Sequence, residues 1–85
     1  MPRLILAAER LILARALIQK ARDYPLPAEG GKYDFSYIAQ VKDLLRQARE
    51  MVRYLPQSAG ASAEVKADAL RIIREADQAD QEILH

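Results

Sequence analysis

Two clusters of helix-breaking residues divide this chain into three segments, and this division constrains the fold more than any other feature of the sequence. Residues 23–31 hold two prolines and a Gly-Gly pair, and residues 56–61 hold Pro56 and Gly60. Such residues interrupt helices. Each segment carries apolar residues three and four positions apart, and none shows the strict alternation of a half-buried strand. The sequence therefore predicts an all-α fold.

The ends of the helices follow from residues with known terminal preferences. Pro2 suits a first helical turn, and Asp34 and Ser62 can cap the next two helices through their side-chain oxygens. Pro56 has no amide hydrogen and disfavours the α conformation in the preceding residue, so the second helix should end at or just before it. We predict helices at about residues 2–23, 35–55 and 63–84.

Helices of similar length joined by short connections favour an antiparallel arrangement. We therefore predict one domain, residues 1–85, folded as an antiparallel three-helix up-down-up bundle and completed by self-association. Its core should be built from three apolar seams: Leu4, Ala7, Leu11, Ala14, Ile18 and Ala21; Ile38, Val41, Leu45, Ala48, Val52 and Leu55; and Val65, Ala69, Ile72, Ala76, Ala79 and Ile83.

The first segment is apolar around more of its circumference than a three-helix bundle can cover. Ile5 and Ile12 flank its seam on one side, and a line of leucines flanks it on the other. A chain of 85 residues without cysteine has a small core and no disulfide to support it, so self-association is expected. We predict a homodimer or higher oligomer in which the first helices of two chains meet through Leu6, Leu13 and Leu17.

The second helix carries a basic stripe at spacings of four, three and four: Lys42, Arg46, Arg49 and Arg53. Such a stripe could bind a phosphate backbone or an acidic partner. The third segment carries an acidic line at Glu64, Asp68, Glu75 and Glu82, and residues 56–85 sum to −3 where residues 1–23 sum to +3. We interpret the two lines as charges that pair between helices, and we keep an anionic partner as the alternative.

Four aromatic residues gather around the first connection: Tyr24, Tyr33, Phe35 and Tyr37. Tyrosines in a loop can form a recognition surface, because each presents a large amphipathic contact area. The favoured interpretation is a lid, in which Leu26, Phe35 and Tyr37 close the end of the bundle. A partner other than a second copy would be expected at this loop.

Nothing in the sequence assembles a catalytic centre or a cofactor site. His85 is the sole histidine and the last residue, and Gly30-Gly31 lacks the context of a phosphate-binding loop. The acidic residues Asp77, Asp80 and Glu82 lie outside the apolar seam, so we predict no metal site. The charged Glu9 and Arg10 interrupt the apolar opening, which argues against a targeting or membrane segment and favours a cytoplasmic protein.

The net charge of +1 gives no field that requires nucleic acid or a membrane as a partner. The sequence therefore predicts a non-enzymatic helical-bundle protein that acts through protein–protein interaction and self-association. The alternative is a small module that binds nucleic acid or another anionic partner through the basic stripe.

Overall fold

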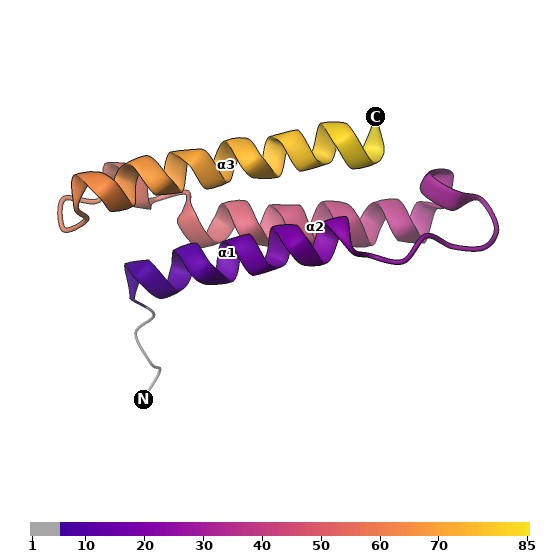
Figure 1. Ribbon diagram of the computed structural model, residues 1–85, viewed down its shortest axis with the longest axis horizontal. Coiled ribbons are helices and arrows are strands. Elements are labelled where there is room, and N and C mark those ends of the chain that lie inside the picture. The colour runs from indigo at the N-terminus through magenta and orange to yellow at the C-terminus, as the bar shows by residue number, and fades with distance from the viewer. Residues whose placement is uncertain (1–5) are drawn as a thin grey trace.

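The computed structural model describes residues 6–85, and three helices make up most of this part of the chain (Figure 1). α1 spans Ala7–Arg22, α2 spans Phe35–Val52 and α3 spans Ala63–Leu84, while Gly31–Tyr33 and Leu55–Gln57 form short 3₁₀ helices. No strand occurs in residues 6–85, so the described chain is all-α, as the sequence predicts. Pro2, Leu4 and Ile5, which the predicted first helix includes, lie outside the described residues.

Side-chain caps begin both α2 and α3, as the sequence predicts. The Asp34 carboxylate accepts a hydrogen bond from the Tyr37 amide at 2.9 Å, and the Ser62 hydroxyl accepts one from the Val65 amide at 3.2 Å. These bonds satisfy amide groups that have no partner within the helix. Before α2 the chain turns through Gly30 at φ 79°, a left-handed conformation that favours glycine.

α1 starts at Ala7, so it does not include Leu6, the first of the three predicted interface leucines. Leu6 is the N-cap of α1 and is extended, with φ −65° and ψ 151°, and its carbonyl accepts the first helical hydrogen bond from Arg10. An N-cap residue has non-helical dihedral angles by nature, so the period of the helix does not apply to its side chain. The prediction that Leu6 continues the helical line of Leu13 and Leu17 is therefore wrong.

The second helix ends at Val52, three residues before the predicted end at Leu55. The chain then tightens into the 3₁₀ helix Leu55–Gln57, in which the Gln57 amide bonds to the Tyr54 carbonyl at 3.2 Å. Pro56 explains the change, because it supplies no amide hydrogen and disfavours the α conformation at the residue before it. The effect of the proline therefore reaches back by nearly a helical turn.

All three helices contribute to one core, and they contact one another in every pairwise combination. The seams are confirmed at their centres, whereas Ile38, Leu55, Val65 and Ile83 are partly buried at the margins. Six of the fourteen residues that are buried between positions 6 and 85 are alanines, whose small side chains let the neighbouring helices approach closely. The buried residues are Leu11, Ala14, Ile18, Ala21, Tyr37, Val41, Leu44, Leu45, Ala48, Val52, Ala69, Ile72, Ala76 and Ala79.

Candidate functional site

The side of α1 that points away from the core is largely apolar, and we call it the outward face of α1. Its most exposed large apolar side chain is Ile12, with 68% of its surface accessible, and Leu13 is 41% accessible. Ala16 is exposed beside them, and Leu6 at the N-cap is 65% accessible. The central line of the face is Glu9, Leu13, Ala16 and Lys20, with Ile12 along one edge and Leu17 along the other.

The three predicted interface leucines occupy different environments. Leu6 is exposed and lies outside the helix, Leu13 is on the outward face, and Leu17 is partly buried against the core cluster. Leu17 therefore marks the boundary between the outward face and the core. Ile12 flanks the predicted seam and is not part of the predicted interface, although its exposure exceeds that of Leu13.

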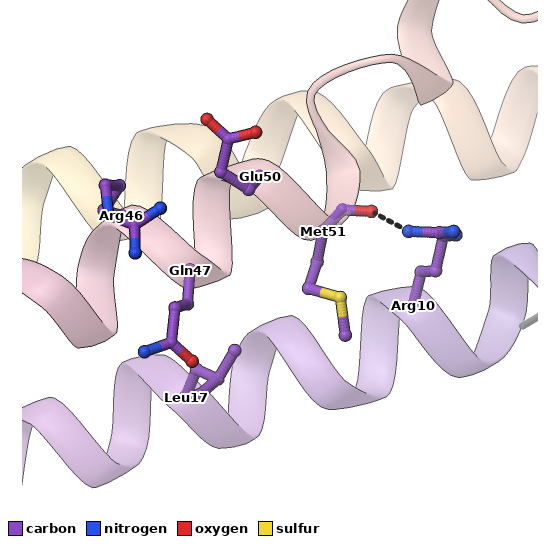
Figure 2. A pocket seen from close by; sticks show the side chains of 6 residues that line it. All are labelled: Arg10, Leu17, Arg46, Gln47, Glu50 and Met51. Atoms are coloured by element: carbon purple, nitrogen blue, oxygen red, sulfur yellow. Dashed lines mark hydrogen bonds between the residues drawn. The ribbon is translucent and has the colours of Figure 1, made fainter.

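A hollow of about 350 Å³ opens between α1 and α2 beside Leu17. Figure 2 shows Gln47 and Met51 pointing from α2 toward Leu17 and Arg10 on α1. A smaller hollow of about 210 Å³ shares Arg10 and Met51 and extends the space toward the end of α2. Leu17 and Met51 make part of the lining apolar, and Arg10, Arg46 and Glu50 add charges of both signs.

Arg10 connects the beginning of α1 to the end of α2. Its Nη1 donates a hydrogen bond to the Met51 carbonyl oxygen at 3.3 Å (Figure 2). Met51 lies in the last turn of α2, where backbone carbonyls lack helical partners and the helix dipole favours a positive charge. The contact explains why a cation is tolerated beside an otherwise apolar part of α1, and it is not among the contacts that the sequence predicts.

The predicted basic stripe is largely engaged with carboxylates. Arg46 contacts Asp43 at 2.7 Å within α2, and Arg53, the residue after α2, contacts Glu50 at 2.8 Å, while Arg49 reaches Asp77 of α3 at 3.2 Å. The hydrogen bond from Arg46 lowers the pKa of Asp43 from its ordinary value. Lys42, the fourth member of the stripe, is exposed. An anionic ligand on this stripe would compete with carboxylates that are already in place.

Ion pairs between α1 and α3 match the predicted attraction between the basic first segment and the acidic third segment. Arg15 donates two hydrogen bonds to Asp68, at 2.9 and 2.7 Å, and lies 3.6 Å from Glu75. Arg22 contacts Glu82 at 2.6 Å nearer the ends of both helices. The predicted acidic line thus serves the packing of α3 against α1 at three of its four positions.

The Arg15–Asp68 pair should make stability sensitive to acid. Hydrogen bonding from Arg15 holds the pKa of Asp68 below its ordinary value of 3.8. A carboxylate whose pKa is lowered by folding stabilises the folded state above its unfolded pKa, and this contribution is lost as the pH falls through the folded pKa. We expect Asp68→Asn to cost less than about 1 kcal/mol at pH 7, because the pair is partly exposed. Urea unfolding should show that this cost shrinks at pH 3.

The matched control for this change is Glu29→Gln, which alters an exposed carboxylate in the first connection. Its unfolding free energy should follow that of the unmodified chain at both pH values. A cost of Asp68→Asn that is the same at pH 3 and pH 7 would contradict a stabilising role for the charged pair.

The aromatic residues of the first connection divide into a buried pair and an exposed group. Tyr24 and Tyr37 pack together with ring centroids 6.0 Å apart and planes tilted by 53°, and Tyr37 is buried. Tyr33 and Phe35 are 76% and 88% accessible, and Leu26 is 62% accessible. The predicted lid is therefore correct for Tyr37 and wrong for Phe35 and Leu26. Phe35 faces outward because it lies seven residues before Lys42, on the side of α2 opposite its buried seam.

The acidic residues near the end of α3 are held by neighbouring side chains. Asp77 contacts Arg49, Asp80 contacts the His85 ring at 3.1 Å, and Glu82 contacts Arg22 and Gln78. Within residues 6–85 no group of three or more histidine, cysteine or acidic side chains is placed to hold a metal ion. In the same part of the chain, no helix combines the length and the apolar character needed to cross a membrane.

Comparison with models of protein families, with curated proteins and with solved structures found no match to this chain.

Proposed function

We propose that this protein is an antiparallel, up-down-up three-helix bundle that acts through protein–protein interaction and self-associates through the outward face of α1. The observation that carries this proposal is the exposure of Ile12 and Leu13 in the middle of a helix whose other side forms the core. Large apolar side chains that gather on one exposed face are typical of interaction sites. Leu6 and the edge residue Leu17 extend the apolar area toward both ends of α1.

Contacts between the helices support the bundle arrangement in this proposal. Arg10 near the start of α1 contacts Met51 near the end of α2, and Tyr24 after α1 contacts Tyr37 near the start of α2. The pairs Arg15–Asp68 and Arg22–Glu82 advance together along α1 and α3. These contacts favour α2 running opposite to both of the other helices.

Sedimentation equilibrium over a range of protein concentrations tests the proposal. One chain has a mass of 9.6 kDa, and we expect the mass to approach twice this value or a higher multiple at micromolar concentrations. Because burial of apolar side chains drives such association, added salt should change the midpoint little. A mass that remains that of one chain at high micromolar concentration would overturn self-association.

Binding of nucleic acid or another anionic partner through Lys42, Arg46, Arg49 and Arg53 is the second candidate. We place it after self-association because three of these four side chains contact carboxylates within the chain. The apolar side chains at the middle of the outward face of α1, Ile12 and Leu13, are by contrast already exposed.

A further inference from the structure

The distribution of charge on α1 gives the orientation and the register in which two copies would meet. We propose that two chains pair through their α1 helices in antiparallel orientation. The two-fold axis that relates them crosses the contact between the two outward faces, at the level along α1 that is midway between Ala14 and Arg15. This inference rests on the proposed self-association and adds to it which residues face each other.

The central line of the outward face carries opposite charges at its two ends. Glu9, Leu13, Ala16 and Lys20 are spaced by four, three and four residues, the spacing of a coiled-coil seam. Glu9 is in the first turn of α1 and Lys20 is in the last. They lie eleven residues apart, or about 16 Å along the helix axis. The face therefore has an acidic end, an apolar centre and a basic end.

A two-fold axis at this position makes the face complementary to itself. Glu9 lies as far before the axis as Lys20 lies after it, so each Glu9 faces the partner's Lys20 and the contact contains two such pairs. Leu13 and Ala16 are likewise equidistant from the axis, so each Leu13 faces the partner's Ala16. A small residue opposite a large one allows the two helices to approach closely.

The edges of the face are apolar and fit the same register. The two-fold axis relates each edge of one outward face to the same edge of the partner's face, on the same side of the contact. The two copies of Ile12 therefore meet along one edge, and the two copies of Leu17 meet along the other. Contact at the Ile12 edge would cover the most exposed large apolar side chain of α1. A parallel pairing would instead set Glu9 beside the partner's Glu9 and Lys20 beside the partner's Lys20, and like charges in facing positions oppose association.

Charge reversal distinguishes the antiparallel register from other dimers. In the proposed dimer, Glu9→Lys places two pairs of lysines across the contact, and Lys20→Glu places two pairs of glutamates there. We expect each single change to weaken dimerisation about tenfold at low salt, and the double change, which restores both pairs, to return it to within about threefold of the unmodified chain. The dimerisation constants are measured by sedimentation equilibrium, and circular dichroism checks the helix content of each variant.

Matched controls carry the same reversals away from α1, at the exposed residues Glu29→Lys and Lys42→Glu, and both should dimerise as the unmodified chain does. If the unmodified chain dimerises but the single reversals on α1 have no more effect than these controls, the register is wrong while self-association stands. Weakening by both single changes without recovery in a folded double variant would also overturn the register. If the unmodified chain stays monomeric, the proposed function itself fails.

Discussion

Replacing Ile72 with alanine should destabilise the folded chain by about 2–5 kcal/mol, since the substitution removes buried methyl groups and leaves a cavity. Ile72 is completely buried and is one of the largest side chains in that state, together with Leu45, Val41 and Val52. A chain of 85 residues is typically stable by roughly 4–13 kcal/mol, so this loss is a large fraction of the total. Thermal unfolding followed by circular dichroism should show a fall in Tm of about 10 °C or more.

The neighbours of Ile72 make its cavity hard to close. Ala69 and Ala76 lie three and four residues away on the same buried seam, and their methyl groups cannot reorient to fill space. Leu70→Ala is the matched control, because Leu70 is on the same helix and 44% accessible. The control should cost less than about 1 kcal/mol. Equal losses for the two variants would contradict the assignment of Ile72 to the centre of the core.

Leu13→Glu should convert the associated protein into single chains. In the proposed dimer, Leu13 lies at the centre of the outward face of α1, and the substitution would bury two carboxylates without partners. We expect the dimerisation constant to weaken at least about a hundredfold, because the penalty occurs twice in a symmetric contact. Sedimentation equilibrium should then give the mass of one chain, 9.6 kDa, where the unmodified protein gives a multiple of it.

Leu70→Glu provides the control for this change. Leu70 and Leu13 are 44% and 41% accessible and both lie within helices, so the two substitutions disturb the single chain to a similar degree. The Leu70 variant should retain the mass of the unmodified protein. Should Leu13→Glu still associate with unchanged affinity, the outward face of α1 is not the contact. The melting temperature of both variants, measured at low concentration, separates loss of association from loss of folding.

The helical segments could be predicted because their signals are local. Asp34 and Ser62 cap helices through bonds that span three residues, and Gly30 stands where the chain turns with positive φ. α2 ends three residues before its predicted end because Pro56 acts on the backbone before it as well as at its own position. The N-cap of α1 at Leu6 differs from the predicted start because an apolar pattern does not reveal where the first helical hydrogen bond forms.

The candidate site was harder to predict because exposure depends on neighbouring helices. The line of leucines in the first segment predicts one common environment, yet Leu17 is partly buried against the core while Ile12 remains exposed. Phe35 could have been placed correctly from its spacing to Lys42, which puts it on the charged side of α2. The bond from Arg10 to the Met51 carbonyl has no sequence signal, since it joins a side chain to a distant backbone group.

The alanines of the core affect folding through conformational entropy as well as through helix spacing. An alanine side chain has no rotamers to lose, so the buried alanines of the described core are ordered without the entropic cost that leucine or isoleucine carries. Each alanine also buries little apolar area, and the packing around it leaves no room for a larger side chain. Replacing one with a larger residue would strain the neighbouring backbones, at a cost of about 1–3 kcal/mol in folding stability. Mutations that raise the folding stability should therefore lie at solvent-exposed helix positions and in the connections between helices. The buried alanine positions accept almost no other residue.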